Sequence, residues 1–190
     1  MYLNTYLILG TMFVRIKKIN GQKYGYLVKN TWTEKGPRQK VSKYLGKIAI
    51  LENSESSKTA TTEKEFEKYI GKTLTEHLAE TTAKKIIIDL IKAELSRNGF
   101  KQKNEMFFLD KIEISIENKK VTIQKTPAVV KLNDGYLCEL TLNNLIEFRP
   151  KEDKTDDELG YALAKAFSDA GIRVPKQVFI AVFEKMMMKN

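Results

Sequence analysis

Two tight-turn signals constrain the segment Val14–Gly46 to fold as three short strands. Asn20-Gly21 is a tight-turn dipeptide because both residue types tolerate a positive φ, and Glu34-Lys35-Gly36-Pro37 supplies a second turn. The stretches beside these turns are rich in β-branched and aromatic residues, which favour strands. The sequence therefore predicts a three-stranded antiparallel sheet within residues 12–48.

The residues of these strands alternate in character, so we expect one apolar face and one basic face. The apolar set is expected to pack inward and comprises Val14, Ile16, Tyr24, Tyr26, Val28, Trp32, Val41 and Leu45. The other set is expected to face water and comprises Arg15, Lys17, Lys23, Lys29, Thr31, Thr33, Arg38, Lys40 and Ser42. Leu27 and Lys43 break the alternation, one on each face.

This segment also carries the excess positive charge of the chain, whose formal net charge is +9. Between Met12 and Ile48 there are ten basic residues and one acid, Glu34, whereas the rest of the chain holds 23 basic and 23 acidic residues. A local basic surface favours a polyanionic partner. The alternative is a solvated face on which lysines deter aggregation of an edge strand.

We interpret the basic face as a nucleic-acid site, with duplex DNA favoured over RNA. A small sheet can enter a major groove or lie along a phosphate backbone, where its cations release counterions. Tyr24, Tyr26 and Trp32 would stack on unpaired bases if they were exposed, but the alternation places them in the core. The expected nucleic-acid-binding residues are Arg15, Lys17, Lys23, Lys29, Thr31, Arg38 and Lys40, with Gln39 as a further contact from an edge position.

The pattern R-x-K-K-x-N-G-x-x-Y-x-Y-L-V, starting at Arg15, and R-Q-K-V-x-K-Y-L-G, starting at Arg38, together resemble a known segment. The segment they resemble is the N-terminal one of some insertion-sequence transposases of the Asp-Asp-Glu class. A similar segment occurs in small stand-alone prokaryotic proteins. The likeness covers about a fifth of the chain and implies DNA contact, not strand transfer, because the catalytic domain of such transposases is not recognisable here. In outline the segment is also similar to the three-stranded DNA-binding domains of tyrosine recombinases.

The composition changes after this segment, which predicts a polar linker at residues 49–62 and an α+β domain at 63–190. Capping boxes at Thr62 and Thr155 begin helical patterns, one running to about Glu80 and one ending at Gly171. A further helical pattern ends at Asn98-Gly99, and another follows Pro175. Between them, residues 106–148 read as a meander of about four antiparallel strands.

The helical pair around Gly171 is interpreted as a core or dimerisation hairpin rather than as a DNA-reading helix-turn-helix. The C-terminal helices are therefore the expected surface for a homo-oligomer. Residues 1–11 are too short to span a bilayer. They could form an extra strand, but we expect a segment upstream of the natural initiator Met12, or a disordered tail. The single cysteine, Cys138, allows no intrachain disulfide, which fits a reducing cytoplasm. No segment approaches a membrane-spanning apolar run, so no membrane contact is expected.

Catalytic patterns are sparse, so we expect a binding protein rather than an enzyme, without a cofactor or a metal ion. There is no P-loop and no G-x-G-x-x-G fingerprint, and His77 is the only histidine. The densest acidic cluster, Asp153–Glu158, is expected to cap a helix. Two alternatives remain open: a metal-dependent nuclease or recombination accessory that uses this cluster, and a protein-interaction module whose basic sheet docks on an acidic partner.

Overall fold

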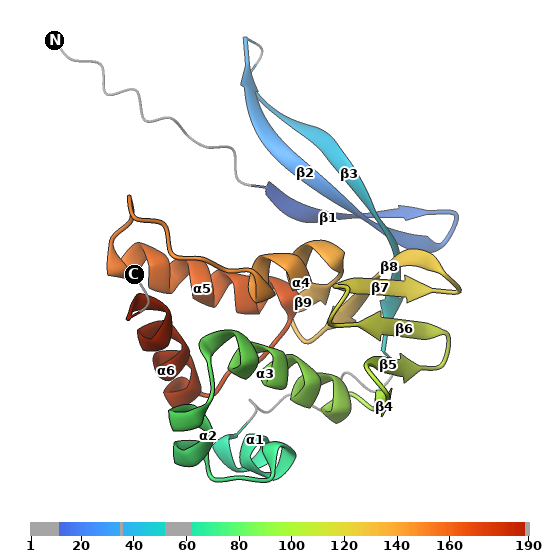
Figure 1. Cartoon of the computed structure of the whole chain (residues 1–190). Coiled ribbons are helices and arrows are strands. Elements are labelled where there is room, and N and C mark those ends of the chain that lie inside the picture. Colours follow the sequence, from blue (N-terminus) through green and yellow to red (C-terminus); the bar gives the residue numbers. More distant parts are fainter. Residues whose placement is uncertain (1–11, 35, 52–61, 189–190) are drawn as a thin grey trace, which may run out of the picture.

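The computed structural model describes residues 12–34, 36–51 and 62–188 and confirms an α+β protein (Figure 1). The N-terminal sheet consists of β1 (Met12–Ile19), β2 (Gln22–Thr33) and β3 (Gly36–Ile50). Three helices follow: α1 (Glu63–Ile70), α2 (Leu74–Glu80) and α3 (Ala83–Arg97). The remaining elements are β4 (Lys101–Lys103), β5 (Met106–Leu109), β6 (Ile112–Ser115), β7 (Lys120–Ile123), β8 (Thr126–Leu132), β9 (Gly135–Leu137), α4 (Glu139–Ile146), α5 (Asp156–Ala170) and α6 (Lys176–Met187).

All nine of these strands belong to one connected sheet, which is larger than the two separate sheets that the sequence predicts. Its order is β1-β2-β3-β8-β7-β6-β5-β4. The ninth strand, β9, lies outside this order and pairs with β8. The N-terminal sheet joins the later strands through a parallel pairing of Lys47–Ile50 with Ala128–Lys131, whereas the other pairings are antiparallel. β3 therefore extends into the predicted linker, and residues 52–61 of that linker, like residues 1–11, lie outside the described residues.

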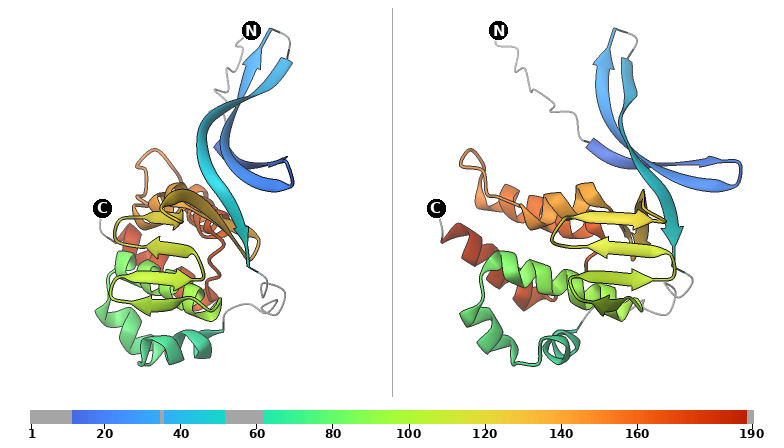
Figure 2. Two further views of the ribbon diagram at one scale, coloured as in Figure 1. Left: turned by 90° about the vertical axis from the view of Figure 1, so that its right-hand side faces the viewer. Right: turned by 45° about the vertical axis from the view of Figure 1, so that its right-hand side comes forward.

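The helices pack beside the later strands and enclose the main hydrophobic core, away from the N-terminal sheet (Figure 2). Its largest fully buried side chains come from the helices α1, α3, α4 and α5 and from the strands β5, β6, β8 and β9, and they include Phe66, Ile86, Leu90, Phe107 and Phe167. The α5–α6 pair contributes Leu163, Val178 and Val182 to the same core, so this hairpin packs as a core element.

Two predictions of secondary structure need correction. The first predicted helix is broken into α1 and α2, because Gly71 ends α1 in the left-handed region and Thr73 begins a new capping box. The meander predicted for residues 106–148 is also too long, since its last strand, β9, ends at Leu137 and the helix α4 begins at Glu139. Cys138 lies between them and is buried, as expected for a small apolar side chain.

A second, smaller core joins the N-terminal sheet to the rest of the molecule. Its buried members are Leu27, Leu45, Ile48, Val129 and Cys138, and Val14, Ile16, Tyr136 and Leu140 pack against it. At its edge, Gly46 has a φ of +126°, and a Cβ on this residue would overlap the Pro127 carbonyl group and lie 2.7 Å from the Ala128 Cα. The close approach of β3 and β8 therefore requires glycine at this position.

We predict that Gly46→Ala destabilises the protein by about 2 kcal/mol more than Gly36→Ala, because only the first methyl group meets backbone atoms. Gly36 is the matched control: its φ is +92° and nothing lies within 4 Å of an added Cβ. Urea unfolding of the two variants measures the difference. Equal losses of unfolding free energy would contradict the proposed contact between β3 and β8.

His77 is buried beside the main core. Its ring packs edge-on against Phe66 at 5.9 Å, and its Nε2 lies 3.4 Å from Oδ2 of Asp89. Burial lowers the pKa of His77 below its ordinary value of 6.5, although the Asp89 carboxylate acts in the opposite direction. The unfolded chain therefore binds a proton at this residue more readily than the folded chain does.

The sign of this shift predicts that stability falls as the pH drops below about 6.5, where the unfolded chain takes up a proton that the folded chain binds more weakly. Because His77 is the only histidine, replacing it isolates the effect. The urea midpoint of the wild type should fall more between pH 7.5 and pH 5.5 than that of His77→Gln. Parallel pH curves for the two proteins would show that the pKa of His77 is not lowered.

Candidate nucleic-acid interface

The turn between β1 and β2 decides which side chains share a face of the N-terminal sheet. The two-residue loop at Asn20-Gly21 pairs Ile19 with Gln22, so that Val14 lies opposite Leu27 and Arg15 lies opposite Tyr26. Directly opposed residues in an antiparallel pair project to the same side. Arg15 and Lys17 therefore share a face with Tyr26 and Tyr24, and Val14 and Ile16 lie on the other face.

The prediction of one basic and one apolar face is consequently wrong. The inward face carries Val14, Ile16 and Leu27 over the small core, whereas Tyr24 and Tyr26 are only partly buried on the opposite side. Trp32, predicted to lie in the core, is 71% exposed. The physical reason is that a two-residue loop pairs odd-numbered with even-numbered residues, which puts Leu27, not Val28, on the face of Val14.

The end of the β2–β3 hairpin projects away from the rest of the molecule (Figure 1). In this part, which we call the β2–β3 ribbon and define as residues 29–34 and 36–40, Lys29 lies directly opposite Lys40 and Thr31 lies opposite Arg38. These four side chains share one face, and the two lysines and Arg38 are exposed. The ribbon thus brings together four of the seven predicted nucleic-acid-binding residues: Lys29, Thr31, Arg38 and Lys40.

The other three predicted residues lie elsewhere on the N-terminal sheet. Arg15 donates a hydrogen bond from Nη1 to Oε1 of Gln39 at 2.7 Å, on the face opposite that of Lys29. Lys17 lies over the ring of Tyr26, 5.2 Å from its centroid. Lys23 pairs directly with Lys18 beside the Asn20-Gly21 turn. The predicted set is therefore distributed over both faces and one end of the sheet.

Little of this charge is neutralised within the protein. Among the described residues of the N-terminal sheet, Lys43 is the one cation that forms an ion pair with a carboxylate, at 3.4 Å from Glu139. Lys29 and Lys40 instead face each other, and so do Lys18 and Lys23. Directly opposed like charges destabilise a sheet. A bound polyanion would relieve both repulsions.

Sequence reasoning placed Tyr24 and Tyr26 in the core and did not consider Tyr44, which lies beside them on the surface. Tyr44 pairs with Tyr26 across β2 and β3, and it is 49% exposed. The ring centroids of Tyr24 and Tyr26 lie 6.3 Å and 5.4 Å from that of Tyr44. Partial burial, followed by the two neighbouring tyrosines, raises the pKa of Tyr44 above its ordinary value of 10.0, so its hydroxyl group is neutral at pH 7.

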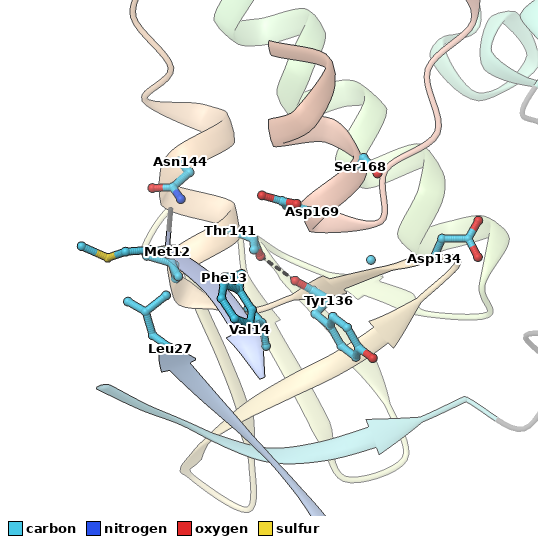
Figure 3. A pocket seen from close by; sticks show the side chains of 12 residues that line it. Met12, Phe13, Val14, Leu27, Asp134, Tyr136, Thr141, Asn144, Ser168 and Asp169 are labelled. Atoms are coloured by element: carbon cyan, nitrogen blue, oxygen red, sulfur yellow. Dashed lines mark hydrogen bonds between the residues drawn. The ribbon is translucent and has the colours of Figure 1, made fainter. Parts of the chain in front are cut away.

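A cavity of about 340 Å³ lies where β1 meets β9, α4 and α5 (Figure 3). Its apolar wall includes Met12 and Leu27, and the Thr141 hydroxyl donates to the Tyr136 carbonyl oxygen at 2.8 Å. Asp134 and Asp169 also line it, but their carboxylates point in different directions, and Asp169 pairs with Lys165. These acids therefore do not form a convergent metal site.

The acidic cluster Asp153–Glu158 lies at the start of α5. Glu158 and Thr155 form a reciprocal capping box, and Lys154 pairs with Glu158 at 3.5 Å. In residues 12–34, 36–51 and 62–188, no three side chains of His, Cys, Asp and Glu are placed to hold a metal ion. The cluster thus serves the helix terminus, as the sequence predicts.

No protein-family model, curated protein or solved structure matches this chain. The likeness of residues 14–46 to transposase N-termini therefore stays a prediction. Within the part of the chain that the structure describes, no helix is both long and apolar enough to cross a bilayer.

Proposed function

We propose that this protein binds duplex DNA through the β2–β3 ribbon, without catalysing a reaction on it. The observation that carries the proposal is the exposed Lys29–Lys40 pair, in which two cations face each other on a projecting hairpin and neither forms an ion pair with a carboxylate of the described residues. Such an arrangement costs stability in the free protein and favours binding to phosphates.

The shape of the ribbon supports the same function. Among the described residues, β1 pairs with β2 only as far as Lys29, so beyond that pair β2 and β3 form a two-stranded hairpin. A two-stranded ribbon fits the major groove of B-DNA, which is about 12 Å wide. One face then presents Arg38 and Thr31 to base edges or phosphates, and the other presents Asn30 and Gln39.

The larger domain is proposed to supply contacts to a second copy or another protein, with the C-terminal helices as the surface. On α5 and α6, Tyr161 is 74% exposed and Ile180 is 43% exposed, so these helices keep apolar side chains outside the core. We propose a cytoplasmic location, in line with the single buried cysteine.

The double variant Lys29→Ala with Lys40→Ala should lose roughly tenfold in affinity for a duplex at low salt, because two phosphate contacts are removed. The variant should fold normally, since both side chains are exposed and repel each other. The matched control is Lys101→Ala with Lys103→Ala, which removes the same charge from the exposed strand β4. Equal losses in the two variants, measured by fluorescence anisotropy, would refute binding through the ribbon.

Salt dependence gives a second prediction. If Lys29, Arg38, Lys40 and one further cation neutralise about four phosphates, the logarithm of affinity should fall against the logarithm of salt concentration with a slope of about −3.6. The Lys29→Ala, Lys40→Ala variant should reduce the size of that slope by about two. A slope near zero for the wild type would exclude this mode of binding.

A further inference from the structure

The three tyrosines of the N-terminal sheet form a continuous aromatic surface, which we call the tyrosine surface: Tyr24, Tyr26 and Tyr44. The central ring, Tyr44, lies 6.3 Å and 5.4 Å from its two neighbours, with tilts of 45° and 54° between the ring planes. About half of its surface is open to solvent. An aromatic group at such a position is available for contact with a planar partner.

Cations surround the tyrosine surface. Lys17 lies over the Tyr26 ring, and Lys47 pairs directly with Tyr24. Both lysines are exposed, and neither forms an ion pair with a described carboxylate. Aromatic rings flanked by cations can bind nucleotides, because the rings stack on bases and the cations neutralise phosphates.

A pocket of about 300 Å³ adjoins the tyrosine surface, and Tyr44 belongs to its wall. Lys43, Lys120 and Lys125 also line it, the last two from β7 and the β7–β8 turn. Among the described residues, Lys43 pairs with Glu139 on the rim, whereas Lys120 and Lys125 have no ion pair. This lysine pocket is at the lower end of the size range of about 300–1,000 Å³ found for ligand sites.

The geometry separates this surface from the β2–β3 ribbon. Tyr44 lies on the sheet face opposite that of Lys29 and Lys40, and it is several pairs away from the ribbon tip along β3. In a duplex, the faces of the bases are covered by neighbouring bases, so an aromatic side chain cannot stack on them. Unpaired bases offer their faces for stacking.

We propose that the tyrosine surface and the lysine pocket bind an unpaired nucleotide of a DNA strand. The base stacks on Tyr44, and its phosphates contact Lys120 and Lys125 at the pocket. The inference rests on the proposed function and extends it, because the ribbon would hold a duplex while this second surface holds an adjoining single strand. The combined substrate is a junction between duplex and single-stranded DNA.

The test compares the variants Tyr44→Leu and Tyr44→Phe. For each, it measures the affinity for a labelled oligothymidylate of twelve nucleotides and for a DNA duplex of equal length. Stacking on a single base predicts that Tyr44→Leu lowers affinity for the oligothymidylate by roughly tenfold and that Tyr44→Phe retains it. Affinity of both variants for the duplex should stay within about twofold of the wild type, because the ribbon is untouched. Lys120→Ala with Lys125→Ala should likewise weaken single-strand binding more than the Lys101→Ala, Lys103→Ala control does.

Several results would overturn the inference. An unchanged affinity of Tyr44→Leu for the oligothymidylate would show that the ring does not stack on a base, and equal losses for single strand and duplex would assign Tyr44 a merely structural role. Wild-type binding of the duplex without the oligothymidylate would refute this inference and leave the proposed function intact. If the wild type bound neither the duplex nor the oligothymidylate at low salt, both this inference and the proposed function would be refuted. Binding of oligouridylate alone would overturn the assignment to DNA.

Discussion

The close approach of β3 to β8 is the constraint on which the rest of the structure depends. Gly46 lies against the backbone of Pro127 and Ala128, and its partner Gly25 lies against the Val129 side chain. With two glycines directly opposed, β8 reaches the N-terminal sheet closely enough for the parallel pairing from Lys47 onward. This pairing makes β1, β2 and β3 one end of a nine-stranded sheet.

The local features of the fold could be predicted from the sequence because short-range chemistry determines them. The Asn20-Gly21 turn and the capping boxes at Thr62 and Thr155 are all present. The break at Gly71 and the helix at Glu139–Ile146 were missed, because apolar spacing continues through both places and only the cap geometry interrupts it. The joining of the two sheets was also missed, since parallel pairing between β3 and β8 leaves no local signature.

The positive charge of the candidate site could be predicted from the sequence, but the face of the sheet on which each side chain lies could not. The excess of cations on the N-terminal sheet is a matter of composition, whereas the side to which each cation points depends on register. For β1 and β2 the signal was present, since the two-residue loop alone pairs Arg15 with Tyr26. Lys120 and Lys125 had no such signal, because only the fold brings them beside Tyr44.

The pairing of β2 with β3 contains two register shifts, which limit the insertions and deletions that this surface can accept during evolution. Between Val41 and Gly46, β3 contains two residues more than the paired part of β2, so Tyr44 faces outward while Leu45 enters the small core. A one-residue insertion or deletion within this stretch would exchange the outward and inward side chains. Length variation should therefore be tolerated just after Thr33, where β2 ends, and excluded from the stretch between Val41 and Gly46, even though both belong to the same hairpin.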